Sequence, residues 1–331
     1  MGESAAAERT RNLALEAVRV TEAAAIASSR HMGRGDERAA DGAAIDAMGI
    51  ALNSLDIDGT VIVGEGERGE APVLYTGQRV GSGKGPRMDI ALDALEGATT
   101  TAKGGNNALA VVALADAGAF LNVPDIYMDK IAVGGGLPAG LIDLDAEPAA
   151  NLAALAAAKG CDVEDLLVCI LDRPRHDELI GRVRDAGARI NLISDGDVSG
   201  IIAMARPESG IDIYMGSGGA RQGILAAAAL RCVGGQMQGR LLFRSEPERA
   251  AGRRLGIEDF GRKYDLRDMI GGEVMVACTA VTDGALLQGV RRFHGGAISH
   301  SMVMRSTSGT VRYIESHHQF DHEHHAHLIE K

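Results

Sequence analysis

The chain of 331 residues contains no tryptophan, and aromatic residues make up only 3% of it. A site on which bases or sugar rings stack needs aromatic side chains, so their scarcity argues against a stacking platform. No run of 18 apolar residues occurs, because a charged residue interrupts every alanine-rich stretch, and this predicts no membrane-spanning helix. The first residues also lack an apolar segment of signal-peptide length, so we expect a cytoplasmic protein with no membrane partner.

Cysteine and positive charge are both in short supply. The four cysteines form no CxxC pair and lie far apart in the sequence, at Cys161, Cys169, Cys232 and Cys278. This spacing predicts buried thiols in a reducing compartment rather than disulfides or zinc ligands. Because 34 Lys and Arg stand against 45 Asp and Glu, the net charge is −11. That balance argues against nucleic acid as a partner and suits a protein that gathers divalent cations.

Glycine and apolar residues, in contrast, are abundant. The 44 glycines indicate many tight turns and close backbone approaches, as phosphate sites require. Hydrophobic residues account for 46% of the chain, enough for a substantial core. The length predicts two domains or one large one, and for two domains we expect the boundary near residue 160.

Apolar spacing predicts the elements of the first half. Helices are expected over 12–30, 36–55 and 149–159, strands over 60–63 and 88–93, and a hairpin over 108–123 that turns at Asp116-Ala117-Gly118. From about residue 165, strand-like LLVCIL, ARINLIS and IDIYM alternate with helical DELIGRVRDAG, DVSGIIAMA and ARQGILAAAALRCV, with GSGG as a loop before the last helix. This βαβαβα order predicts an α/β fold with a parallel sheet.

A glycine-rich loop, GEGERG at 64–69, follows the strand expected over 60–63. It matches the GxGxxG pattern of dinucleotide-binding loops. Its acidic residues would repel a pyrophosphate, however, and no clear helix follows it before Ala71-Pro72. The loop is better suited to cations.

Four carboxylates form a candidate metal site: Asp41, Glu65, Asp93 and Glu96. Asp41 lies four residues before Ile45, on the apolar stripe of its helix, where a carboxylate is costly unless it is paired. The alternative is an exposed carboxylate stabilised by the helix dipole in the first turn. The other three lie at predicted strand ends. Oxygen donors without His or Cys suit Mg²⁺ or Mn²⁺; four unrelated solvated acids are the alternative.

Four further groups of residues could take part in binding, but their spacing also fits a purely structural role. Arg173-Pro174-Arg175-His176 follows one strand and Asp195-Gly196-Asp197 the next, so they either bind a phosphorylated sugar or are surface charges beside turns. The loop Gly216-Ser217-Gly218-Gly219 is either an anion site or an ordinary turn. Near the C-terminus, Glu315, His317, His318, His322, His324, His325 and His327 form a cluster that we interpret as a solvated tail rather than a metal site.

Seven segments, in order, resemble the class II fructose-1,6-bisphosphatases, a family of lithium-sensitive, metal-dependent sugar-phosphate phosphatases. They are GRGDERAADGAA, VIVGEGERGEAPVLYTG, MDIALDALEGA, LNVPDIYMDKIAVG, LDRPRHDELI, SDGDVSG and GGQMQGRLL, and the resemblance spans about residues 12–318. It implies a layered α/β/α sandwich with a mixed sheet in the N-terminal half and a more parallel sheet in the C-terminal half. It also implies a metal-binding phosphatase domain over 1–160 and a substrate-binding domain with a His-rich tail over 161–331.

The activity implied is removal of the 1-phosphate of fructose 1,6-bisphosphate in gluconeogenesis, by a homo-oligomer using Mn²⁺ or Mg²⁺; some relatives also act on sedoheptulose 1,7-bisphosphate. By motif, the metal ligands are Asp41, Glu65, Asp93 and Glu96. The substrate-binding positions are Glu96, Gly97, Ala98, Tyr127, Arg173, Pro174, Arg175, Asp195, Gly196, Asp197 and Gly219.

Two positions depart from the family pattern. Ala98 stands where the family has the threonine that orients the attacking water, which leaves Thr99 as the candidate catalytic hydroxyl. Gln222 stands where the family has a glutamate metal ligand, with Arg221 beside it. The alternatives to an active bisphosphatase are therefore a weak or inactive paralogue that binds sugar phosphates as a sensor or oligomer partner, and an enzyme whose Arg221 selects another anion.

Overall fold

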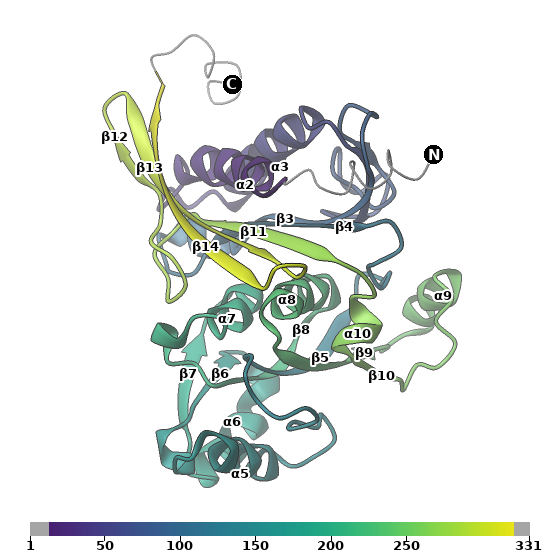
Figure 1. Cartoon of the computed structure of the whole chain (residues 1–331), viewed down its shortest axis with the longest axis vertical. Coiled ribbons are helices and arrows are strands. Elements are labelled where there is room, and N and C mark those ends of the chain that lie inside the picture. The colour runs from purple at the N-terminus through teal and green to yellow at the C-terminus, as the bar shows by residue number, and fades with distance from the viewer. Residues whose placement is uncertain (1–12, 321–331) are drawn as a thin grey trace. The chain divides into compact units, whose positions relative to one another are not determined.

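The computed structural model describes residues 13–320, and contacts divide these into two units. Unit 1 comprises residues 13–120 and 272–320, and unit 2 comprises 121–271. This division differs from the one expected from the sequence, which had a single boundary near residue 160. The last strands of the chain return to the sheet formed by the first ones (Figure 1), and local sequence patterns do not reveal such a return. None of the helices between residues 13 and 320 combines the length and the hydrophobicity that a membrane-spanning segment requires.

Unit 1 is a mixed sheet covered by two long helices. Its elements are α2 (Ala14–Ser29), α3 (Glu37–Asn53), β1 (Asp58–Val63), β2 (Arg79–Val80), β3 (Arg87–Glu96), α4 (Ala98–Lys103), β4 (Leu109–Asp116), β11 (Val274–Ala280), β12 (Arg291–Phe293), β13 (Gly296–Arg305) and β14 (Thr310–Gln319). The strand order is β12-β13-β11-β4-β3-β1-β2, with β14 also paired to β13.

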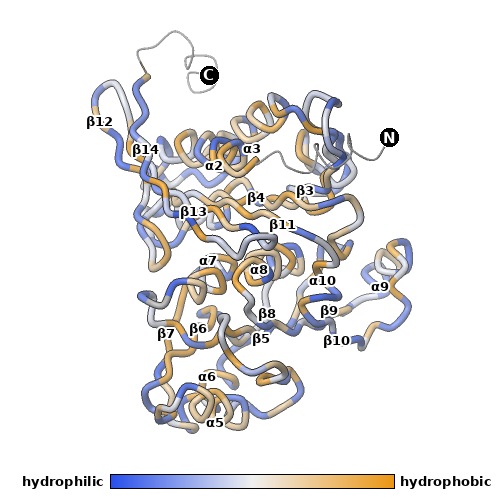
Figure 2. The backbone as a smooth tube through the Cα atoms, in the orientation of Figure 1, coloured by the Kyte–Doolittle hydropathy of each residue, from blue (hydrophilic) through white to orange (hydrophobic). Residues whose placement is uncertain are grey.

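The helices expected over 12–30 and 36–55 are confirmed as α2 and α3. Asp36 begins α3, because its side chain accepts a hydrogen bond from Ala39 N at 3.0 Å and satisfies an otherwise unpaired amide. On the expected stripe, Met48 and Leu52 are fully buried against the sheet, and each such side chain contributes about 1.5–3 kcal/mol. Hydrophobic residues dominate β4 and β11, whereas α9 is largely hydrophilic (Figure 2).

Two expectations in unit 1 were wrong. Residues 108–123 do not form a hairpin: β4 ends at Asp116 and pairs with β3 and β11 instead. Glu315, His317 and His318 do not belong to a solvated tail, since they lie in β14, which pairs with β13 along its whole length. The remaining histidines of that cluster (322, 324, 325 and 327) lie outside the described residues.

Unit 2 contains the alternating part of the chain. Its elements are β5 (Tyr127–Val133), α5 (Pro148–Lys159), η1 (Val163–Asp165), β6 (Leu167–Leu171), η2 (Pro174–His176), α6 (Asp177–Asp185), β7 (Arg189–Ile193), α7 (Asp197–Ala203), η3 (Pro207–Ser209), β8 (Ile213–Gly219), α8 (Ala220–Val233), β9 (Gln236–Leu242), α9 (Glu246–Arg254), β10 (Lys263–Asp265) and α10 (Leu266–Met269). The strand order is β10-β9-β5-β8-β6-β7.

The parallel sheet predicted for this part comprises β7, β6 and β8, and antiparallel β5, β9 and β10 extend it. Each unit thus has a mixed sheet, and the layered α/β class is confirmed. The expected loop 216–219 is the end of β8 instead, because Gly216–Gly219 pair with Tyr127–Lys130. Ile131 of β5 packs in the core that includes α5 and α6, whereas Lys130 contacts Asp197 at the start of α7, so helices cover both faces.

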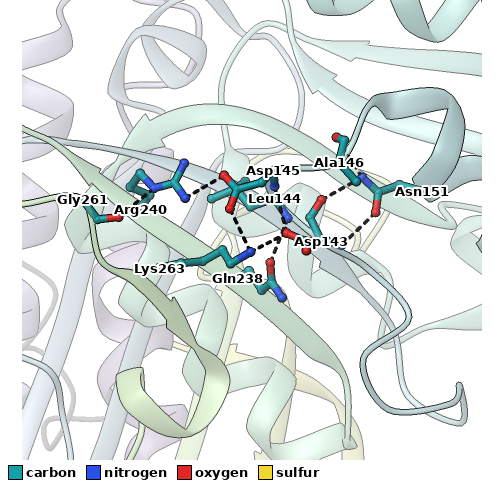
Figure 3. A network of polar contacts seen from close by, with 9 residues as sticks. All are labelled: Asp143, Leu144, Asp145, Ala146, Asn151, Gln238, Arg240, Gly261 and Lys263. Atoms are coloured by element: carbon teal, nitrogen blue, oxygen red, sulfur yellow. Dashed lines mark hydrogen bonds and ion pairs between the residues drawn. The ribbon is translucent and has the colours of Figure 1, made fainter.

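An ion network holds the segment before α5 against β9 and β10 (Figure 3). Lys263 donates to Asp143 and Asp145, and Arg240 donates to Asp145 Oδ1 at 2.7 Å. The hydrogen bonds from Lys263 lower the pKa of both carboxyl groups. Because these groups are solvent-exposed, the network orients the segment more than it stabilises the fold.

Candidate active site

The four candidate metal ligands all lie in unit 1. Strands β1 and β3 are parallel neighbours in which Val63 pairs with Ala91; Glu65 follows the end of β1 by two residues, and Asp93 lies two residues beyond Ala91 in β3. Ala94 N donates to Glu65 Oε1 at 2.7 Å, which fixes the Glu65 carboxylate against the end of β3. Glu96 ends that strand and is buried. The structure therefore brings Glu65 to the segment that carries Asp93 and Glu96.

The loop begins with glycine because the backbone at Leu74 lies very close to residue 64. A Cβ on Gly64 would lie 2.1 Å from the Leu74 carbonyl oxygen, so the backbone can approach only without a side chain. No helix follows the loop before β2, in agreement with the rejection of a dinucleotide site.

Asp41 lies within α3, which packs against both β3 and α4. Its side chain is half-buried, and burial raises the pKa of its carboxyl group. This environment differs from the fully exposed first turn considered as the alternative. In residues 13–320, no three His, Cys, Asp or Glu side chains form a ready-made group that could hold a metal ion.

A tight turn connects the acidic strand end to α4. Gly97 has a φ of 91°, in the left-handed region that favours glycine, and α4 starts directly after it at Ala98. Ala98 and Thr99 are both partly exposed at the start of α4. Successive helix residues point about 100° apart, so a hydroxyl on Thr99 is aimed differently from one on residue 98.

The other substrate-binding candidates gather at one edge of the sheet in unit 2. Parallel β6, β7 and β8 end there, and antiparallel β5 begins there. Ligands of α/β sheets bind outside the carboxyl ends of parallel strands. This edge carries Arg173, Pro174 and Arg175 after β6, Asp195, Gly196 and Asp197 after β7, Gly219 at the end of β8 and Tyr127 at the start of β5.

Two guanidinium groups surround Tyr127. The Cζ atoms of Arg175 and Arg244 lie 4.9 and 4.7 Å from the centroid of its ring. Each cation–π contact is attractive, but together they hold two like charges around one exposed phenol. Such an arrangement favours an anion that the two guanidinium groups can share.

Asp197 is held by a buried ion pair. Lys130 is 1% exposed and Asp197 5% exposed, and the Lys130 ammonium bonds Asp197 Oδ2. The same ammonium donates to the Gly219 carbonyl oxygen at 3.1 Å. Lys130 thus links the start of α7 to the end of β8. Asp195 lies in the turn before α7 and accepts a hydrogen bond from Gly196 N at 3.0 Å, where Gly196 has a φ of 85°.

The residues at the start of α8 are packed closely. A Cβ on Gly219 would lie 2.0 Å from Gln222 Oε1, so the glycine admits the Gln222 side chain. Arg221 is buried and forms an ion pair with Asp125 at 3.5 Å. This environment gives no support to Arg221 as a recognition group for a different anion.

Sequence reasoning missed Lys130 and Arg244, and it included His176 in the group at 173–176 without a role of its own. Lys130 had a detectable signal, because a cation within an apolar strand must be paired when it is buried. Arg244 had none: its proximity to Tyr127 depends on the pairing of β5 with β9, in which Tyr127 lies opposite Leu242.

Comparisons with known proteins identify the family of the chain. Residues 11–318 match the family model described as "Bacterial fructose-1,6-bisphosphatase, glpX-encoded". The chain is 44% identical over 325 residues to "Fructose-1,6-bisphosphatase 1 class 2" of Escherichia coli K12, covering 94% of this chain and 96% of that protein. The same identity and coverage relate it to "Fructose-1,6-bisphosphatase class 2" of Escherichia coli O6:H1 and of Shigella flexneri. The chain therefore belongs to the family of bacterial class 2 fructose-1,6-bisphosphatases.

Proposed function

We propose that this chain is a phosphoric monoester hydrolase that removes the 1-phosphate of fructose 1,6-bisphosphate with the help of a divalent metal ion. The observation that carries the proposal is the 44% identity to class 2 fructose-1,6-bisphosphatases over 94% of the chain. The charged edge of the sheet in unit 2 supports it, since Arg175 and Arg244 around Tyr127 suit a phosphate. No observation favours a non-catalytic sugar-phosphate sensor.

We assign the metal to Asp41, Glu65, Asp93 and Glu96. The chemistry of this donor set fits Mn²⁺ or Mg²⁺, because carboxylates alone suit hard cations. Glu65 is tethered beside Asp93, and Glu96 is buried at the end of the same strand. A bound cation would polarise the phosphoryl group and activate a water molecule.

The remaining residues bind and orient the substrate. Arg173 and Arg175 would bind a phosphate, and Asp195 would accept hydrogen bonds from sugar hydroxyls. Asp197, which is buried and paired with Lys130, would hold the start of α7 beside them. The same groups would accept sedoheptulose 1,7-bisphosphate, which differs only in the sugar chain. We further propose a homo-oligomer that acts in the cytoplasm, in gluconeogenesis.

The position of bond cleavage tests this assignment. The native chain, with Mn²⁺ and fructose 1,6-bisphosphate, should release one equivalent of phosphate and leave fructose 6-phosphate, identified by ³¹P nuclear magnetic resonance. Fructose 6-phosphate supplied alone should stay intact. Accumulation of fructose 1-phosphate, or equal hydrolysis of both compounds, would contradict the proposal.

Restoring the family threonine should accelerate the reaction. We expect Ala98→Thr to raise kcat by at least about tenfold, because a positioned proton-transfer group typically contributes about 10²–10⁴-fold. Ala98→Val is the matched control, with the same β-branched shape but no hydroxyl. If Ala98→Thr has no effect while Thr99→Ala lowers kcat, Thr99 supplies the hydroxyl instead.

A further inference from the structure

His176 lies at the end of η2, between Arg175 and α6, and only 3% of it is exposed. Both ring nitrogens are engaged. Nδ1 lies 2.7 Å from the Leu171 carbonyl oxygen, and the Ser217 amide nitrogen lies 2.8 Å from Nε2. Because a carbonyl only accepts and an amide N–H only donates, Nδ1 carries the proton and Nε2 accepts. These two hydrogen bonds fix the tautomer and the orientation of the ring.

Ser217 connects this ring to Arg175. Arg175 donates to the Ser217 carbonyl oxygen from Nη2 at 2.8 Å and from Nε at 3.2 Å, and also to Ser217 Oγ at 3.1 Å. The amide of Ser217 is thus held by His176, while its carbonyl oxygen holds the guanidinium group. That guanidinium group is one of the two around Tyr127.

The ring also fits closely against the neighbouring strand. Gly216 has a φ of 143°, and a Cβ there would lie 3.2 Å from His176 Cε1 and Nε2. To admit a side chain at residue 216, the imidazole would have to shift by a few tenths of an ångström. Because Gly216 has no side chain, the His176 ring can pack directly against the backbone of β8.

We propose that His176 is a positioning residue for substrate binding, which holds Ser217 so that the Arg175 guanidinium group is oriented toward the phosphate. It touches no reacting atom itself. The inference rests on the proposed function for the identity of the substrate, and it predicts a loss of substrate affinity rather than of turnover.

Two amide variants separate positioning from simple packing. His176→Gln can place a carbonyl oxygen where Nε2 lies and still accept from Ser217 N, whereas His176→Asn reaches only as far as Nδ1. We expect His176→Asn to raise KM for fructose 1,6-bisphosphate about tenfold, equivalent to about 1.4 kcal/mol, with kcat within about twofold of native. His176→Gln should retain most of the native affinity.

Calorimetric binding of fructose 1,6-bisphosphate supplies a second readout that needs no turnover. It separates failure of this inference from failure of the proposed function, because a native chain that binds the bisphosphate without hydrolysing it still allows the variants to be compared. If His176→Asn does not fold, the affinity of His176→Gln relative to native decides alone: retention supports the inference, and a tenfold loss contradicts it.

A double-mutant cycle tests whether His176 acts through Arg175. In an Arg175→Met background, His176→Asn should cause no further loss of affinity, because the group that it positions is already gone. Fully additive losses would overturn the inference. Two other results would also overturn it. One is that both amide variants bind fructose 1,6-bisphosphate as tightly as the native chain does. The other is that both variants lose kcat and thermal stability while KM stays unchanged.

Discussion

Asp93→Asn should reduce metal-dependent phosphate release from fructose 1,6-bisphosphate by about 10²-fold or more. The amide removes one negative charge from the donor set at the end of β3, where Glu65 is already tethered to Ala94 N. A metal ion supplies several kcal/mol of transition-state stabilisation, and each ~1.4 kcal/mol corresponds to a factor of ten in rate. Steady-state kinetics over a range of Mn²⁺ concentrations measures the effect.

The matched control for this variant is Asp46→Asn, which makes the same chemical change at an exposed position of α3. It should leave kcat and the Mn²⁺ dependence unchanged. Circular dichroism should show both variants folded. Native turnover by Asp93→Asn, at any metal concentration, would refute the assignment of Asp93 as a ligand.

Lys130→Met should lower the free energy of unfolding of unit 2 by about 3–5 kcal/mol, because it leaves the Asp197 carboxylate buried without its cation. The substitution nearly preserves side-chain volume, so the loss reports charge and hydrogen bonding rather than a cavity. It also removes the donor to the Gly219 carbonyl oxygen. Urea unfolding monitored by circular dichroism measures the change.

Two further variants test the cause of that loss. Lys130→Met combined with Asp197→Leu should regain much of the stability, because replacing both members of a buried pair by apolar groups is often neutral. Arg253→Met breaks an exposed pair with Glu246 and should have no measurable effect. If Lys130→Met unfolds at the same midpoint urea concentration as the native chain, the Lys130–Asp197 pair contributes nothing to stability.

Residues whose roles depend on local pattern could be predicted from the sequence. The apolar stripe of α3 and the alternation of β6 to α8 follow from side-chain periods of 3.6 and 2, which are properties of short segments. Glu65 and Asp93 could be identified as candidate ligands because they lie at the ends of expected strands, whereas the parallel pairing of β1 with β3 that brings these ends together is seen only in the structure.

Features that depend on pairing between distant segments could not be predicted. The strands β11, β13 and β14 join the sheet of β3 and β4, although about 150 residues of chain separate them, so a boundary at residue 160 misses the return. The hairpin expected around Asp116 failed for the same reason: β4 finds its partners in β3 and β11. The proximity of Arg244 to Tyr127 likewise requires the register of β5 with β9.

The most direct test of the central claim is phosphate release from fructose 1,6-bisphosphate by the native chain, with Mn²⁺ and after chelation. We predict turnover with Mn²⁺, none after chelation, recovery when Mn²⁺ is restored, and a faster reaction in Ala98→Thr/Gln222→Glu. The contradictory result is a native chain that stays inactive at every metal concentration while the double variant turns over. That outcome would mean that the native protein does not hydrolyse this substrate, although its scaffold can support the reaction.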